Sequence, residues 1–312
     1  MKVKKFHKAL ASGYLLFIVA LLYFIGIRLA GTESTDYSKL WITTGIQLLT
    51  AFSLLFFYQG FIAFRGRNLL PFGFYLLFVS LDPSFFYDWQ GSLYAPGILL
   101  CFYFLFRTYQ EKRPQKYVLN MGIVLTAGTL FHPVFYLLIP VFLLGLIRMN
   151  NLNSKTFLAT LCGGIFVYVL LLCWCLFHND ATMFLGFFPD WTVFRPELLQ
   201  FQLEEIPIFA YLLILLIFSG TYIYFAGISE KLKTRIYLSF LLFFSLFLFG
   251  LVVLESQWIQ EWLQLLSFTL SLLIAHFFGL PGKKAKTYFL LLSILFFMGM
   301  GIWNLIKVDY LN

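Results

Sequence analysis

Five ionisable residues in or beside long apolar stretches have side chains that can do chemistry: Asp82, Asp88, His132, Arg28 and Arg195. A charge at the centre of a bilayer costs about 2.5–3.5 kcal/mol on insertion scales. A functional role is therefore the first interpretation of an ionisable residue in such a segment. A carboxylate can take a proton from an acceptor hydroxyl, and a histidine can share that transfer. Asp82, Asp88 and His132 are therefore candidate catalytic residues. Arginine binds phosphate, which makes Arg28 and Arg195 candidate phosphate-binding residues.

The two aspartates also have a structural interpretation. Asp82 before Pro83 is typical of a turn, because Asp binds local backbone amides and Pro fixes the bend. The aspartates are six positions apart and one turn does not satisfy both. If Asp82 caps the turn, Asp88 is left free for chemistry, with Tyr87 and Trp89 beside it as a platform for a sugar or headgroup. Asp88 is then the general base and Asp82 orients it.

The other ionisable residues also have structural interpretations. His132 before Pro133 is compatible with a tight turn, and Arg28 is long enough to extend to lipid headgroups. His276 lies within a full-length apolar segment, where a packed or hydrogen-bonded histidine is more common than a ligand.

Four apolar segments around the aspartates and His132 are short for a membrane crossing. They are 13 to 15 residues long and cover Leu69–Leu81, Leu93–Phe106, Tyr117–Phe131 and Pro133–Ile147. As helices they reach about 20–23 Å, against a hydrocarbon core of about 30 Å. They predict two hairpin-like pairs, 69–106 and 117–147, whose tips lie in a recess inside the membrane. Local thinning of the bilayer is the alternative.

The overall composition predicts an all-α polytopic membrane protein. Apolar residues make up 61% of the 312 residues and charged residues 12%, with a mean hydropathy of +0.86. These values are far from a soluble average and predict a single transmembrane domain over 1–312. The net charge of +8 does not indicate nucleic-acid binding, because the basic residues lie in short gaps between apolar segments.

Longer apolar segments complete the pattern. Together with the four short ones they predict about eleven transmembrane helices. The longer segments are Ala9–Ala30, Trp41–Phe64, Thr156–Phe177, Pro207–Ile228, Ile236–Leu254, Trp262–Leu280 and Thr287–Ile306. An external segment, 178–206, has apolar residues suited to the membrane interface and a weak helical pattern from Pro196 to Glu205.

The positions of the basic residues predict the topology. With the N-terminus in the cytosol, all of the 22 Lys and Arg residues except Arg28, Lys39, Arg195 and Lys307 fall in cytosolic segments. This bias is the positive-inside rule, and it places the C-terminus outside. This bias requires two crossings in Tyr117–Ile147, because a single crossing would move every later loop to the opposite side of the membrane.

The sequence predicts no cofactor and no metal site. The four cysteines fall within apolar segments, where a thiol behaves as a small hydrophobe: Cys101, Cys162, Cys173 and Cys175. There is no glycine-rich phosphate loop and no cluster with metal-ligand spacing.

The middle of the chain resembles an uncharacterised family of multi-pass inner-membrane proteins from Gram-negative bacteria, a domain of unknown function. The resemblance covers 69–172 and rests on Ala127-Gly128-Thr129-Leu130-Phe131-His132-Pro133, a polar turn at Met149–Lys155 and Thr160-Leu161-Cys162-Gly163-Gly164. It implies a bacterial inner-membrane location and no settled activity.

The chain is also similar, more broadly, to multi-span glycosyltransferases that use polyprenyl phosphate and carry acids on the outer side. Those enzymes usually hold an acidic pair in a long first external loop, whereas here Glu33 and Asp36 lie in the short loop 31–40. The resemblance implies an enzyme acting on a lipid-linked glycan or lipid, with membrane lipids and polyprenyl-phosphate-linked sugar as partners. A scaffold bound to other envelope membrane proteins and a transporter are the alternatives.

Reporter fusions test the predicted topology. Fusions after Lys116 and Lys155 are expected to be cytosolic, and fusions at Gly91 and after the last span external, because the basic gaps stay inside. Paired alkaline phosphatase and fluorescent protein fusions measure this. An external location at Lys155 would rule out the second hairpin.

Overall fold

The structure is a computed structural model that describes residues 13–30, 37–62, 68–178, 184, 205–225, 231–254, 259–279 and 284–311. Within these ranges the regular structure is helical and no strand occurs, which confirms the predicted all-α fold. Arg195 and most of the predicted external segment, 178–206, lie outside the described residues.

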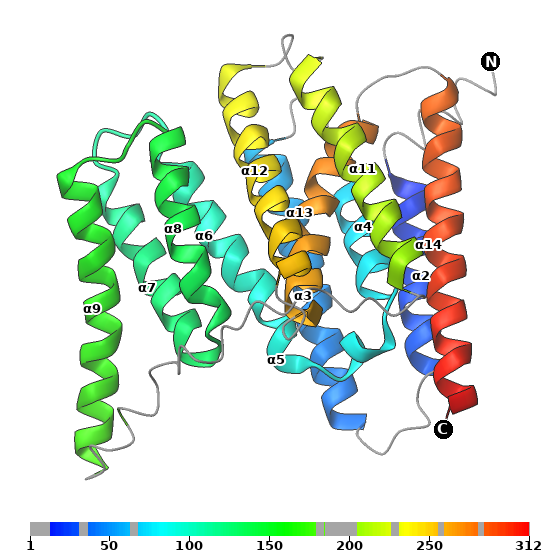
Figure 1. Ribbon diagram of the computed structural model, residues 1–312, viewed down its shortest axis with the longest axis horizontal. Coiled ribbons are helices and arrows are strands. Elements are labelled where there is room, and N and C mark those ends of the chain that lie inside the picture. Colours follow the sequence, from blue (N-terminus) through cyan, green and yellow to red (C-terminus); the bar gives the residue numbers. More distant parts are fainter. Residues whose placement is uncertain are drawn as a thin grey trace. The chain divides into compact units, whose positions relative to one another are not determined.

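Every predicted apolar segment contains a helix (Figure 1). The helices are α2 (Tyr14–Ala30), α3 (Tyr37–Phe61), α4 (Leu70–Val79), α5 (Trp89–Ser92), α6 (Tyr94–Thr108), α7 (Gln115–Phe131), α8 (Val134–Arg148), α9 (Ser154–Phe177), α11 (Glu205–Phe225), α12 (Leu232–Leu254), α13 (Ile259–Gly279) and α14 (Lys284–Leu311), with a 3-10 helix η1 (Pro83–Phe86).

Seven helical stretches in the described part are long and apolar enough to cross a membrane. They are Tyr37–Phe61, Trp89–Thr108, Ser154–Phe177, Pro207–Phe225, Leu232–Leu254, Ile259–Gly279 and Thr287–Ile306. Tyr14–Ala30, Leu70–Val79 and Phe135–Arg148 are apolar but shorter. The protein therefore has the helices of a polytopic membrane protein, and a total of eleven crossings stays a prediction.

The described helices form two compact units, where the sequence alone predicts one transmembrane domain. Unit 1 contains α2 to α5 with η1, the first two residues of α6, and α11 to α14. Unit 2 contains α6 from Pro96 onward, α7, α8 and α9.

Unit 1 encloses the short helix α4. All ten residues of Leu70–Val79 are buried, and α4 packs against α2, α3, α13 and α14. A helix that is apolar on every side is stable where protein surrounds it. Because its neighbours cover it, α4 does not need the length of a full membrane crossing.

The turn that follows α4 lies within the same unit. Phe85 and Phe86 of η1 are buried, and side chains of longer helices bind the turn's carbonyl groups. Gln47 Nε2 donates to the Phe85 oxygen at 3.2 Å, and Asn304 Nδ2 donates to the Leu81 oxygen at 2.8 Å. Non-helical backbone at membrane depth requires partners of this kind.

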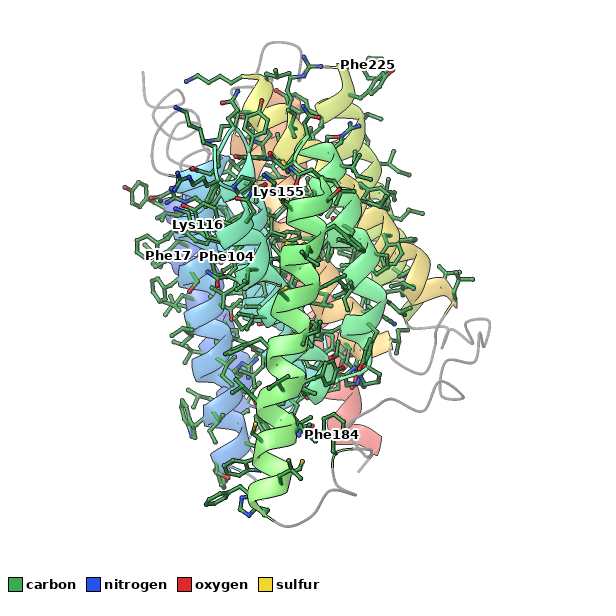
Figure 2. The ribbon with its side chains drawn as sticks, turned by 90° about the vertical axis from the view of Figure 1, so that its left-hand side faces the viewer. Phe17, Phe104, Lys116, Lys155, Phe184 and Phe225 are labelled. Atoms are coloured by element: carbon green, nitrogen blue, oxygen red, sulfur yellow. The ribbon has the colours of Figure 1, made fainter. Side chains whose placement is uncertain are left out.

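Unit 2 contains the second predicted hairpin. The predicted break is confirmed, since α7 ends at Phe131 and α8 begins at Val134. Figure 2 shows Lys116, in the first turn of α7, and Lys155, in the first turn of α9, at the same end of this unit, with Phe184 at the opposite end. This arrangement agrees with two antiparallel helices rather than one long span.

Helices α7 and α9 approach each other through small residues, side by side in Figure 1. A Cβ added at Gly163 would lie 2.4 Å from the Leu119 carbonyl oxygen, and one at Gly122 would lie 2.6 Å from the Thr160 oxygen. Close backbone contact at small residues is a common mode of helix association in membranes. A recurring Gly-x-x-x-Gly pattern does not mark this contact in the sequence, because Thr160 takes part in it.

Gly163→Ala is expected to destabilise the protein by about 1–3 kcal/mol, because the methyl group meets backbone atoms that side-chain rotation does not move. Gly45→Ala is the control, since its added Cβ meets nothing within 4 Å, and it should be neutral or stabilising by up to about 1 kcal/mol. Thermal unfolding of the purified proteins in detergent measures both. Equal midpoints would contradict the close α7–α9 packing.

Candidate functional site

Arg28 lies in the last turn of α2 and is buried within unit 1. Only 3% of its surface is exposed. The guanidinium carbon lies 4.3 Å from the centre of the Phe24 ring and 4.5 Å from that of Phe86. Aromatic faces attract cations, and a basic residue at a helix C-terminus interacts well with the helix dipole. Arg28 therefore does not extend to the surface of the unit.

The hydrogen-bond partners of Arg28 are neutral. Nη1 donates to Thr44 Oγ1 at 3.1 Å, and Nη2 donates to Gln47 Oε1. Nε is buried and has no hydrogen-bond partner in the described part of the chain. The hydroxyls of Tyr75 and Tyr87 are near enough to interact electrostatically, but they are phenols rather than carboxylates. The positive charge thus has no ion-pair partner among the described residues.

Gln47 connects Arg28 to the turn between α4 and α6. Besides accepting from Arg28, it donates to Ser92 Oγ at 3.0 Å and to the Phe85 oxygen. Ser92 Oγ in turn donates to the backbone oxygen of Asp88 at 2.8 Å. One hydrogen-bond network therefore runs from α2 through α3 to η1 and α5.

Asp88 is anchored on both carboxylate oxygens. Oδ1 accepts from the Gly91 amide at 2.8 Å and caps α5, while Oδ2 accepts from Gln264 Nε2 of α13 at 3.0 Å. Position 91 needs glycine, because an added Cβ would lie 1.9 Å from Asp88 Oδ2. The carboxylate retains unused lone pairs, since each of its two oxygens can accept twice.

Asp82 caps η1, as expected, by accepting from the Ser84 amide at 2.9 Å. The expectation that this leaves Asp88 free is wrong, because the residues between them form two short helical turns instead of one. Each turn has its own aspartate cap. Both aspartates belong to unit 1 and are partly exposed, as is Trp89, whereas Tyr87 packs against the Ile27–Leu40–Phe86 cluster.

His132 belongs to unit 2, where it forms the C-terminal cap position of α7. Its backbone amide donates to the Gly128 oxygen at 2.9 Å, and its side chain is largely buried. His276, in α13, lies with Nδ1 3.5 Å from the Tyr58 hydroxyl, in agreement with the hydrogen-bonded interpretation.

Sequence reasoning missed the amide side chains that connect this site, Gln47 and Gln264. A signal was present, because Thr43, Gln47 and Thr50 form a polar stripe along one face of an apolar helix and all three are buried. Glu261, one turn before Gln264, was also missed; it lies near enough to Asp88 for their charges to interact.

Within the described residues no group of three or more His, Cys, Asp or Glu side chains could hold a metal ion.

Compared with known proteins, the chain matches no protein-family model, no curated protein and no solved structure. The family resemblances noted from the sequence stay predictions.

Gln264→Leu is expected to destabilise the protein by about 1–3 kcal/mol, since it removes the bond between α13 and Asp88 and leaves a carboxylate oxygen without its donor. Gln260→Leu is the matched control, because Gln260 is exposed on the same helix. Thermal unfolding of both variants provides the measurement. A midpoint for Gln264→Leu equal to that of the control would show that this bond contributes nothing to the fold.

Proposed function

We propose that the protein is a multi-pass enzyme of the bacterial inner membrane that acts on a lipid-linked glycan or lipid at the outer leaflet, in a glycosyltransferase-like manner. Asp88 is the general base, and Arg28 binds the phosphate of the lipid substrate. The observation that carries the proposal is the network Arg28–Gln47–Ser92–Asp88, which connects an unpaired cation to the backbone of the residue that carries the carboxylate.

The proposed step is a glycosyl transfer. The Asp88 carboxylate takes the proton of an acceptor hydroxyl, and the hydroxyl oxygen forms a bond to the anomeric carbon of the donor sugar. The bond between that carbon and the phosphate oxygen breaks, and the electron pair leaves with the phosphate. Arg28 binds the donor phosphate, which is a singly charged diester before the transfer, and so orients the anomeric carbon toward the acceptor.

The fixed orientation of Asp88 supports this assignment. A base must keep a defined geometry toward its acceptor, and the bonds from Gly91 and Gln264 lock the carboxylate while leaving lone pairs available. Trp89 is 39% exposed beside it and offers an aromatic face for a sugar. Asp82 then serves to hold the preceding turn.

A scaffold for other envelope membrane proteins is the second candidate. The capping roles of both aspartates favour it, because capping alone explains an aspartate before a helical turn. In a scaffold the two carboxylates contribute only stability, and their basicity has no role.

Asp88→Asn separates the two functions. Asn keeps the size and the oxygen that accepts hydrogen bonds but removes the basicity. The variant is expected to insert and accumulate near the wild-type level but to lose the envelope-glycan or lipid phenotype that the wild-type gene restores to a deletion strain. Complementation and immunoblotting measure this.

Asp82→Asn is the matched control, since it makes the same change in the neighbouring cap and is expected to complement. Full complementation by both variants would exclude carboxylate catalysis at this turn and leave the scaffold as the leading function.

A further inference from the structure

We infer that the unpaired edge of the Arg28 guanidinium is a binding site for one singly charged oxyanion carried by a lipid, such as a phosphodiester. The inference rests on the proposed function and specifies the charge and the lipid character of its substrate. The observation behind it is the buried guanidinium nitrogen Nε, which has no hydrogen-bond partner in the described part of the chain.

The geometry of the guanidinium leaves one direction for a ligand. Phe24 and Phe86 rings lie near it at 4.3 and 4.5 Å. Nη1 and Nη2 already donate to Thr44 and Gln47. Of the three guanidinium nitrogens, Nε is the one that is buried without a partner in the described part of the chain. Nε and the second proton of the adjacent Nη form the side edge of the guanidinium, which matches two oxygens of one phosphate or carboxylate.

The charge balance favours a single negative charge. Arg28 carries one positive charge, its hydrogen-bond partners are neutral, and a buried charge requires a counter-ion. An anion with one negative charge completes the pair. A second negative charge would itself be left uncompensated in a site where 3% of the arginine surface is exposed.

The surroundings favour a lipid over a free ion. Ile27, Leu40 and Phe86 form a buried apolar cluster around this part of the unit. Tyr23, Tyr87 and Leu305 pack against the cluster and are only partly buried. Because Arg28 is 3% exposed and lies against Phe86 of this cluster, an oxyanion bound to it has to leave water for apolar surroundings. Acyl chains offset that cost, whereas a hydrated free phosphate has nothing to offset it.

The test measures binding to the purified full-length chain in neutral detergent. The probes are dihexadecyl phosphate, which is a singly charged phosphodiester, monododecyl phosphate, which carries a second ionisable group, and inorganic phosphate. Native mass spectrometry counts the bound probe, and the ligand-induced rise in thermal midpoint gives the affinity. The expected order of affinity is dihexadecyl phosphate first, monododecyl phosphate weaker, and inorganic phosphate without effect.

Two substitutions at position 47 distinguish the effect of an added negative charge on probe binding from the effect of lost hydrogen bonds on folding. Gln47→Glu gives the guanidinium an internal carboxylate and should abolish probe binding. Gln47→Met loses the same donor to Phe85 and Ser92 but adds no charge, so it controls for folding and should bind the probe more weakly than the wild type but more tightly than Gln47→Glu. Arg28→Lys keeps the charge without the two-donor edge and should bind at least about tenfold more weakly, as expected for loss of one charge-assisted hydrogen bond.

The inference is overturned if Gln47→Glu binds dihexadecyl phosphate as the wild type does, if inorganic phosphate competes with that probe, or if monododecyl phosphate binds equally well. Asp88→Asn distinguishes this failure from failure of the proposed function. If Asp88→Asn complements a deletion while wild-type binding follows the expected order, the enzyme proposal fails and the oxyanion site stands. If Asp88→Asn fails to complement and the order is not observed, the Arg28 site fails and the enzyme proposal stands on Asp88 alone, without phosphate binding by Arg28.

Discussion

The burial of one positive charge sets the main constraint on unit 1. Removing a guanidinium from water is costly, and a carboxylate partner would be the usual way to offset that cost. Arg28 instead lies near two aromatic rings and donates to one hydroxyl and one amide. These groups stabilise the cation without neutralising it, so the site keeps its attraction for an anion.

Gln47 is the side chain on which this arrangement depends most. A primary amide both accepts and donates, and here its oxygen binds Arg28 while its nitrogen binds Ser92 and the Phe85 carbonyl. Neither Glu nor Met can provide both functions. The same residue therefore satisfies the buried charge and fixes the turn that carries Asp88.

The short helix α4 makes room for this turn inside the unit. Because α4 ends at Val79, the chain reverses while α2, α3, α13 and α14 still surround it. The reversal exposes backbone carbonyls that would be costly in an apolar environment, and Gln47 and Asn304 bind two of them. The length of α4, the polar stripe on α3 and the depth of the turn are consequences of one packing arrangement.

Hydropathy and charge pattern alone determined the helical class, the position of every predicted apolar helix in the described chain and the break at His132, because apolar runs and Pro are local signals. They also singled out Arg28, Asp82 and Asp88, since charge inside an apolar run is visible in the sequence. The local cap of Asp82 was also predictable, but only the tertiary structure decided what Arg28 and the second carboxylate oxygen of Asp88 bind. Gln47 and Gln264 contact Arg28 and Asp88 across 19 and 176 positions of the chain, and no local pattern encodes such pairings. The division into two units and the contact of Gly163 with α7 likewise arise from packing between helices, which depends on the shapes of surfaces distant in sequence.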